Sequence, residues 1–250
     1  MNRILFDKSE IISGVATFDD VRAEHAVKVL HVEKGQILKT GEIDGLVGTA
    51  EVLSVSEDGG GKYSVSVRVS HDTPSMKPWI DLVLAPPRPR VMKRLLPQLA
   101  SLGVGRIVLV GAKKVEKDFW GATLLKSEIY KPLLVDGLMQ SGSSVMPEML
   151  VRRAFRRFVS DELDSLFDSH LRYVAHPSKA ATLDVSPAQS STRKVLLAVG
   201  PEGGWTEDEV SLLEEKGFVR YSLGPRILRT DTALVALIAR LMERYDTAGL

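Results

Sequence analysis

The sequence predicts a mixed α/β protein in which a small N-terminal β-barrel precedes a larger α/β domain built on a parallel sheet. Two observations lead to this fold class. Short β-rich runs separated by turn residues fill the first seventy positions, which is typical of a small barrel. Beyond residue 78, continuous apolar runs alternate with segments of helical periodicity, which favours a parallel sheet covered on both faces. We therefore expect two domains, 1–72 and 79–250.

The barrel is predicted from three β-rich runs and the turns between them. The runs occupy residues 36–40, 46–55 and 63–69, and the last alternates apolar with polar residues, as a half-buried strand does. Turns containing glycine separate the runs, at Lys34-Gly35, Asp44-Gly45 and Asp58–Gly61. Residues 71–78 include Pro74 and Pro78, and we expect this stretch to link the two domains.

The second domain is predicted to alternate strands with helices. Strands are expected at 80–85, 106–110, 171–175, 194–199 and around Tyr221. Apolar residues at helical spacing predict helices at 91–102, 122–139, 207–216 and 231–245. Gly103 supplies the end of the first helix, and Pro132 must begin or kink part of the second.

The composition excludes several classes of protein. The chain has 250 residues, of which 44% are hydrophobic and 26% charged, so a collagen-like or wholly disordered chain is excluded. The absence of cysteine excludes disulfides, thiolate catalysis and Cys-ligated metals. No apolar run reaches 18 residues, Asp7 and Glu10 interrupt any signal-peptide core, and the five histidines have no metal spacing. We expect a cytoplasmic protein with no membrane segment and no metal.

The net charge of +1 hides an uneven distribution. Residues 1–76 carry a net charge of −4, residues 77–157 carry +9, and residues 158–250 carry −4. A basic strip of this kind could release counterions from a phosphate backbone, although cations on helix faces are as often merely solvated. The first cluster within the strip consists of Arg88, Arg90, Lys93 and Arg94.

A buried strand is predicted to run directly into the glycine-rich turn Val199-Gly-Pro-Glu-Gly-Gly204. Thr206 and Glu209 then form a capping box for the next helix. Parallel sheets bind ligands at the carboxyl ends of their strands, and glycines let a ligand approach the backbone. The segment is neither a dinucleotide fingerprint nor a P-loop, and Glu202 makes a nucleoside or a cationic cofactor a better ligand than phosphate alone. A purely structural turn with a helix cap is the alternative.

The segment Leu223-Gly-Pro-Arg-Ile-Leu-Arg-Thr-Asp-Thr-Ala233 repeats this design of strand, Gly-Pro turn and capped helix. Two such loops at successive strand ends can converge on one pocket. Arg226 and Arg229 would lie beside it, and an Arg buried at a strand end needs a reason. Alternatively, Arg229 pairs with Asp231 or Glu202 as part of the scaffold.

Together, these two segments resemble the signature of the RsmE-type 16S ribosomal RNA uracil-N3 methyltransferases, which belong to the SPOUT class. The resemblance extends to Met1–Phe6, His25–Leu30, Leu102–Val108 and Gln140–Gly142. It implies a PUA-like RNA-binding barrel, a SPOUT α/β domain with a trefoil knot, and a homodimer. It also implies that S-adenosylmethionine binds in the knot and that the substrate is 16S rRNA, within the small ribosomal subunit.

The resemblance also implies which residues act. The cofactor would lie against His176 and two loops, whose contact residues are Val199, Gly200, Pro201, Gly203, Gly204, Leu223, Gly224, Ile227 and Leu228. Because N3 of uracil must lose a proton, we expect Arg229 to stabilise charge on the ring and Asp231 or Glu202 to accept the proton. RNA contacts are expected from Arg3, Arg22, His25 and Lys28 in the barrel, and from Arg88, Arg90, Lys93 and Arg94 in the second domain.

Several residues depart from the common family pattern. Pro86–Lys93 replaces the usual lysine-containing approach to the first catalytic helix, and Ser143 stands where arginine is common. Asp231 replaces glutamate, and His31 replaces arginine. These departures motivate one alternative, a catalytically silent RNA-binding ribosome assembly factor with the same fold. A nucleotide-dependent metabolic α/β enzyme is a third interpretation, and the basic middle segment is its main difficulty.

Overall fold

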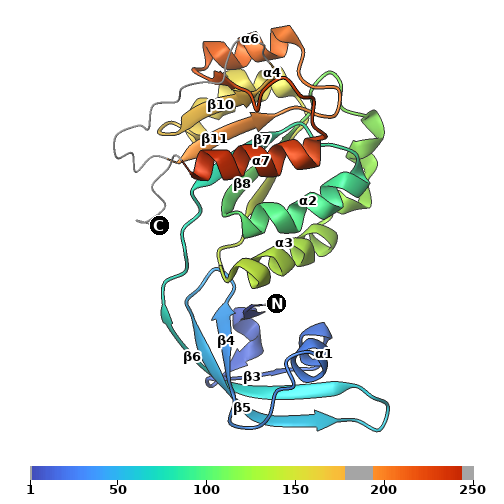
Figure 1. Cartoon of the computed structure of the whole chain (residues 1–250), viewed down its shortest axis with the longest axis vertical. Coiled ribbons are helices and arrows are strands. Elements are labelled where there is room, and N and C mark those ends of the chain that lie inside the picture. The colour runs from blue at the N-terminus through green and yellow to red at the C-terminus, as the bar shows by residue number, and fades with distance from the viewer. Residues whose placement is uncertain (1, 178–193, 244–250) are drawn as a thin grey trace. The chain divides into compact units, whose positions relative to one another are not determined.

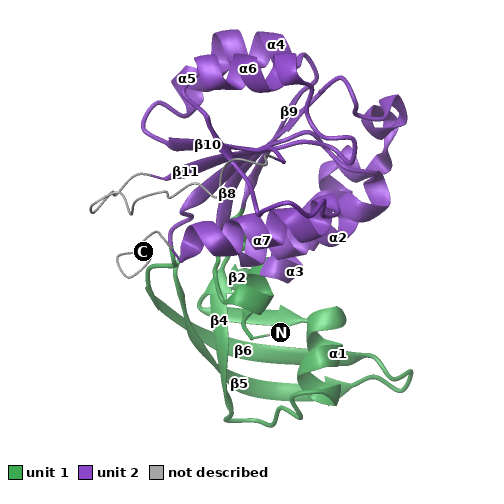
Figure 2. Ribbon diagram, turned by 45° about the horizontal axis from the view of Figure 1, so that its top comes forward, with its two compact units in different colours: residues 1–76, 138–146 green, residues 77–137, 147–250 purple. Residues whose placement is uncertain are grey.

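The computed structural model describes residues 2–177 and 194–243, and the chain forms two compact units. Unit 1 comprises Met1–Met76 together with Leu138–Met146, and unit 2 comprises Lys77–Gly137 and Pro147–Leu250 (Figure 2). The sequence-based division placed residues 138–146 in the second domain, whereas in the structure they belong to unit 1. The association of residues 138–146 with unit 1 depends on hydrogen bonds between residues that are distant in the sequence, which no local pattern encodes.

Unit 1 is a curled sheet of six strands. They are β1 (Ile4–Phe6), β2 (Ile11–Ile12), β3 (Val15–Phe18), β4 (Ile37–Glu42), β5 (Val47–Glu57) and β6 (Tyr63–Thr73), in the order β1-β4-β5-β6-β3-β2. The β1–β4 pair is parallel and the other pairs are antiparallel. The Asp44-Gly45 turn joins β4 to β5, and Asp44 has a positive φ of 58°, a conformation that aspartate tolerates better than most residues. Helix α1 (Val21–Lys28) follows β3 and begins at the cap residue Asp20.

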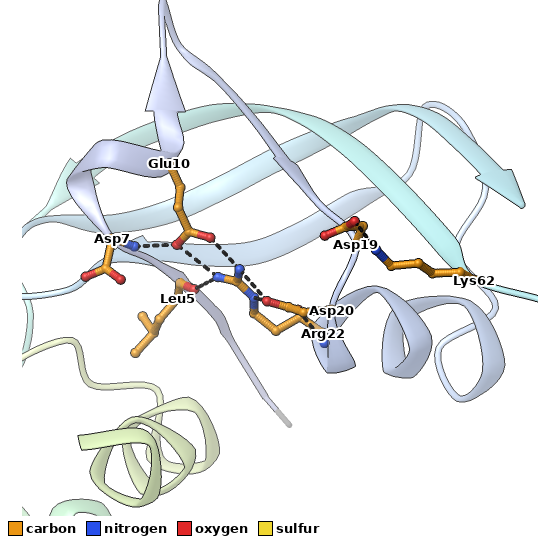
Figure 3. Close-up of polar contacts among 7 residues, drawn as sticks. All are labelled: Leu5, Asp7, Glu10, Asp19, Asp20, Arg22 and Lys62. Carbon is orange, nitrogen blue, oxygen red and sulfur yellow. Dashed lines mark hydrogen bonds and ion pairs between the residues drawn. The ribbon is translucent and has the colours of Figure 1, made fainter. Parts of the chain in front are cut away.

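An arginine cluster ties the start of α1 to β1. The guanidinium of Arg22 donates to the carboxylates of Glu10 and Asp20 and, at 2.7 Å, to the carbonyl oxygen of Leu5 (Figure 3). The same group lies over the rings of Phe6 and Phe18. Charge-assisted hydrogen bonds of this kind hold a partly buried cation in one place. The cluster therefore fixes the entry of α1 relative to the sheet.

The segment 138–146 is joined to the rest of unit 1 by hydrogen bonds. The backbone amides of Asn2 and Arg3 donate to the carbonyl oxygen of Met139 at 3.0 Å. The hydroxyl of Ser144 donates to the carbonyl oxygen of Gly45 at 2.7 Å, and that serine is fully buried. Ser143 is also buried, with its hydroxyl 3.4 Å from that of Ser75.

Unit 2 is built on a six-stranded sheet that is parallel throughout. Its strands are β7 (Ile80–Leu84), β8 (Val104–Val110), β9 (Glu148–Arg152), β10 (Leu171–Ala175), β11 (Val195–Val199) and β12 (Val219–Tyr221), in the order β12-β10-β11-β7-β8-β9. Residues of β7 and β11 are buried at every position, as expected for central strands covered on both faces.

Helices cover both faces of this sheet (Figure 1). Helices α2 (Pro89–Ser101) and α7 (Thr230–Met242) lie on one face, whereas α6 (Glu207–Glu215) lies on the other. The second face also carries the short helices α4 (Phe155–Arg157) and α5 (Leu163–Leu166), with a π-helical turn at Phe158–Glu162 between them. Phe155, Phe158 and Trp205 belong to the core cluster that this second face buries.

The structure differs from the sequence-based expectations in a few elements. Helix α3 spans Ser127–Ser141, so the expected start at residue 122 is wrong, and 3₁₀ turns at Lys117–Gly121 and Thr123–Leu125 precede it. Pro132 lies inside α3. Strand β9 and the helices of 155–166 were not predicted, because arginines interrupt their apolar pattern. The expected end of the last helix, at 245, lies outside the described residues.

Candidate active site

Three strand ends meet at one cavity in unit 2. Strands β10, β11 and β12 end at Ala175, Val199 and Tyr221, and parallel pairing brings these carboxyl ends to the same edge of the sheet. A cavity of about 280 Å³ lies there and extends to the first turns of α7. This is the position at which open α/β sheets bind ligands.

All ten residues that the sequence assigned to a cofactor line this cavity. They come from three segments far apart in the chain: His176, then Val199, Gly200, Pro201, Gly203 and Gly204, then Leu223, Gly224, Ile227 and Leu228. Further lining residues were not assigned to the cofactor, among them Ala175, Tyr221, Ser222, Thr230 and Ala233. The signal for most of them was their adjacency to a predicted strand end or loop.

The first loop has a tightly constrained backbone. A Cβ atom at Gly200 would lie 2.9 Å from the backbone nitrogen of Trp205, so no larger residue fits without moving the loop. Gly204 has a φ of +67°, and its amide donates to the carbonyl oxygen of Pro201 at 2.8 Å. Glycine is thus required at 200 for space and at 204 for backbone conformation.

A buried carboxylate fixes the end of this loop. Glu209 accepts hydrogen bonds from the amide of Thr206 at 2.8 Å and from its hydroxyl at 3.0 Å, which completes the predicted capping box of α6. Its other carboxylate oxygen accepts a 2.8 Å hydrogen bond from the amide of Lys113, in the loop after β8.

His176 lies at the cavity with an acidic neighbour. Its Nε2 is 3.0 Å from a carboxylate oxygen of Glu207, the first residue of α6. Burial lowers the pKa of the His176 imidazole, and the nearby guanidinium of Arg220 lowers that pKa further. The lowered pKa favours the neutral imidazole at neutral pH.

The three residues expected to be catalytic occupy different positions. Glu202 lines the cavity, and its carboxylate accepts a 3.0 Å hydrogen bond from the amide of Arg88. Arg229 and Asp231 do not line the cavity. The Arg229 side chain is 73% exposed, and its Nε is 3.6 Å from Asp231. Arg226, which is also exposed, is among the residues that line the cavity.

Asp231 lies in the first turn of α7 between two cations. Its carboxylate accepts hydrogen bonds from the amide of Thr232 at 3.0 Å and from the guanidinium of Arg94 at 3.1 Å. Burial alone would raise the pKa of Asp231, but the Thr232 amide, Arg229 and Arg94 hold that pKa below its usual value. A carboxylate with a lowered pKa is a weak general base.

The structure places the expected RNA contacts of unit 1 in unequal settings. Arg22 is engaged in the cluster of Figure 3, with a side chain only 14% exposed, and its ion pairs raise its pKa despite burial. Arg3 donates to the carbonyl oxygens of Thr40 and Gly48. His25 is half-buried, whereas Lys28 is exposed and paired with Glu24 at 2.6 Å. Arg3 and Arg22 therefore serve the fold of unit 1.

The expected RNA contacts of unit 2 are exposed. Arg90, Lys93 and Arg94 lie one turn apart on α2, and Arg88 is the cap residue that precedes it. Arg88 pairs with Glu116 at 2.8 Å and Arg94 pairs with Asp231. These four cations lie on the loop and helix that follow β7, the strand beside β11.

The described residues contain neither a metal-binding cluster nor a membrane-spanning helix. Residues 2–177 and 194–243 contain no group of three or more His, Asp or Glu side chains placed to hold a metal ion. The same residues form no helix that is both long enough and apolar enough to span a membrane.

Known proteins resemble this chain over nearly its whole length. Residues 74–242 match the family model of the RNA methyltransferase domain. The ribosomal RNA small subunit methyltransferase E of Treponema pallidum is 32% identical over 96% of this chain and 90% of its own length. The ribosomal RNA small subunit methyltransferase E 1 of Borreliella burgdorferi is 24% identical over 94% of this chain and 95% of its own.

Solved structures share the fold. A methyltransferase of Legionella pneumophila in complex with the bound cofactor SAM has a TM-score of 0.73 at 24% identity, and 97% of each chain is covered. The ribosomal RNA small subunit methyltransferase E of Neisseria gonorrhoeae, bound to S-adenosyl methionine, has a TM-score of 0.72 at 23% identity, with 98% of each chain covered.

The match to the family model includes both loops of the cavity and the whole of the sheet that carries them. Sequence identity to the Treponema relative extends through both units. The chain belongs to the RNA methyltransferase family and, within it, to the small-subunit ribosomal RNA methyltransferases of the E type.

Proposed function

We propose that this protein methylates N3 of a specific uridine in 16S ribosomal RNA, within the small ribosomal subunit, with S-adenosylmethionine as methyl donor. One observation carries the proposal. The cavity at the ends of β10, β11 and β12 is lined by every residue that the family resemblance assigns to the cofactor. The relatives named above supply the class of reaction and substrate.

The cavity has the chemistry that such a cofactor needs. Its walls are mainly backbone and apolar side chains, such as Leu223, Ile227 and Leu237, which suit an adenosine. Glu202 and Arg226 add one negative and one positive charge at the same cavity. Opposite charges of this kind complement a ligand that carries an ammonium, a carboxylate and a sulfonium. The trefoil knot implied by the resemblance belongs to this proposal.

When bound, S-adenosylmethionine supplies an activated methyl group, so the protein mainly aligns the transfer and handles one proton. The N3–H bond of uracil breaks and the proton goes to a carboxylate. N3 would then form a bond to the methyl carbon as the bond between that carbon and the sulfonium sulfur breaks, which leaves S-adenosylhomocysteine. We assign proton acceptance to Glu202, because it lines the cavity and Asp231 has a lowered pKa outside it. We assign stabilisation of the negative ring to Arg226 in place of Arg229, because Arg226 lines the cavity and Arg229 does not.

RNA binding completes the proposal. The exposed cations Arg88, Arg90, Lys93 and Arg94 are assigned to the RNA backbone, because phosphate contacts require accessible charge. In unit 1, Lys28 and His25 stay candidates for RNA contacts, as expected for a PUA-like domain.

From the family resemblance we also infer a cytoplasmic homodimer. Light scattering at micromolar concentration tests the dimer.

The decisive experiment has two arms. Calorimetry with S-adenosylmethionine tests cofactor binding, and mass spectrometry of 16S RNA from a deletion strain tests the reaction. We expect binding, and loss of one N3-methyluridine that returns with the wild-type gene but not with an Arg226→Ala variant. An unchanged methyluridine profile would overturn the proposed reaction.

A catalytically silent assembly factor is the second candidate, and the departures at Pro86–Lys93 and Ser143 motivate it. Ser143 is buried in unit 1, where arginine would not fit without rearrangement. Calorimetry separates the candidates, because a silent factor that has lost the donor site would show no heat of binding.

A further inference from the structure

A lysine outside the cavity contacts the backbone of the glycine loop 200–205, which lines the cavity. The ammonium of Lys114 donates to the carbonyl oxygen of Gly203 at 2.7 Å and contacts that of Trp205 at 3.4 Å. Lys114 lies in the loop after β8 and does not line the cavity. It therefore reaches the loop from outside the cavity.

The aliphatic part of Lys114 also explains the glycine at position 203. A Cβ atom at Gly203 would lie 2.9 Å from Cδ and 3.2 Å from Cβ of Lys114. Gly203 does not have a positive φ, so its backbone conformation does not require glycine. Close packing of the lysine stem against the Cα of Gly203 is the reason that a larger residue does not fit.

Three further contacts join the same loops. The amide of Lys113 donates to the buried carboxylate of Glu209, just beyond the glycine loop. On the other side, the amide of Arg88 donates to Glu202, while the guanidinium of Arg88 pairs with Glu116 in the loop that carries Lys114. The loops after β7, β8 and β11 are thereby linked at the carboxyl edge of three adjacent strands.

We propose that Lys114 is a positioning residue for the cofactor, acting through the glycine loop 200–205. By donating to two carbonyl oxygens on the outside of the loop, Lys114 fixes the backbone whose inner side forms the cavity wall. Backbone fixed before binding loses less conformational entropy when the ligand arrives, so affinity is higher. This inference rests on the proposed function, since the ligand is S-adenosylmethionine.

The test compares Lys114→Met with Lys113→Met. Methionine keeps an unbranched apolar stem and removes the ammonium. The Lys113 side chain is exposed and has no hydrogen bond or ion pair within the described residues, and its contact with Glu209 uses the backbone amide, which the substitution keeps. The two variants therefore lose the same charge from neighbouring positions, and only the first loses the contact with the loop.

We expect Lys114→Met to bind S-adenosylmethionine roughly 3- to 10-fold more weakly by calorimetry, the range for one partly exposed charged hydrogen bond. Hydrogen exchange of a peptide covering 200–206 should be faster in the apo protein. In turnover assays KM for the cofactor should rise while kcat changes little. Lys113→Met should match the wild type in all three measurements, and Lys114→Arg should restore most of the affinity.

The outcomes separate this inference from the proposed function. Wild-type affinity together with wild-type exchange in Lys114→Met would overturn the positioning role. An equal loss of affinity in Lys113→Met would also overturn it, because general electrostatics would then explain both variants. If the wild type binds no S-adenosylmethionine, the proposed function fails, whereas the exchange experiment on the apo protein still decides whether Lys114 orders the loop.

Discussion

Arg94 on α2 donates a 3.1 Å hydrogen bond to the carboxylate of Asp231 in the first turn of α7. The pair joins the helix that carries exposed cations to the helix whose first turns line the cavity. Asp231 is also well placed to interact with the positive end of the α7 dipole. Because the Arg94 side chain is about half exposed, the pair contributes little to stability, about 1 kcal/mol at most.

The cations of α2 are expected to contribute to RNA affinity rather than to folding. Arg90→Ala and Arg94→Ala should each weaken binding of a 16S fragment. Each should also reduce the slope of log Kd against log salt concentration by about 1, the effect of losing one phosphate contact. Cofactor affinity should not change. Fluorescence anisotropy at several salt concentrations measures this. Lys194→Ala is the control, because Lys194 is exposed at the opposite, amino end of β11; an equal effect of Lys194→Ala would contradict the assigned surface.

Arg226 and Arg229 are expected to differ in their effect on the chemical step. Arg226→Ala should lower kcat about 100-fold or more, as loss of a group that stabilises transition-state charge does. Arg229→Ala should retain most of kcat, because the Arg229 side chain points to solvent. Single-turnover assays at saturating RNA measure both. The reverse pattern would return the charge-stabilising role to Arg229.

Gly200 and Gly204 test two different reasons for a glycine. Gly200→Ala places a methyl group against the backbone of Trp205, which should cost about 1–3 kcal/mol and weaken cofactor binding. Gly204→Ala adds a methyl group in open space and should cost only about 1 kcal/mol of backbone strain at positive φ. Urea denaturation measures the change in the free energy of unfolding, and calorimetry measures the change in cofactor affinity. Equal effects on cofactor affinity would show that the close approach at Gly200 does not shape the cavity.

Arg22 is expected to stabilise unit 1 and to have no direct effect on RNA. Arg22→Met should lower the free energy of unfolding by about 2–4 kcal/mol, because it leaves the partly buried carboxylate of Glu10 and the exposed carboxylate of Asp20 without their cation. Lys62→Met, which breaks the exposed pair with Asp19 in the same unit, is the control and should cost less than about 1 kcal/mol. Chemical denaturation measures both; a neutral Arg22→Met variant would contradict the structural role.

The same cluster predicts how unit 1 responds to acid. Burial alone would raise the pKa values of Glu10 and Asp20, but hydrogen bonds from Arg22 and from the backbone hold both below their usual values of 4.5 and 3.8. Lowered carboxylate pKa values stabilise the folded state above the unfolded pKa, and this contribution is lost as the pH falls through the folded values. The urea midpoint should therefore fall more steeply below about pH 4 in the wild type than in Arg22→Met. Parallel profiles would contradict the assigned pKa shifts.

The sequence predicted the fold class and most of the elements, because apolar runs and helical spacing are local properties. The strands ending at Ala175 and Val199, the helix starting after Thr206 and the two glycine loops all lie close to their expected positions. Elements with mixed composition were missed. Arginines at 152, 153, 156 and 157 obscure β9 and α4, whose apolar residues are recognised as core only once the sheet is assembled.

The distribution of the cations was visible in the sequence, but their availability was not. Arg22 and Arg90 have the same charge, but acidic residues lie near Arg22 in the chain, whereas prolines and other cations flank Arg90. Carboxylates that lie 2 and 12 residues away surround Arg22, whereas Arg90 lies exposed on α2. Which arginine stays free for RNA depends on tertiary neighbours, because an ion pair forms only where folding brings its partner.

By itself, the sequence determined a two-part α/β protein with glycine loops at strand ends and a basic middle segment, because these features follow from composition and local spacing. Only the tertiary structure decided that Arg226 rather than Arg229 lines the cavity, and that Lys114 holds the glycine loop from outside. Parallel pairing of distant strands creates these relationships, and such contacts lie far beyond the range of any sequence pattern.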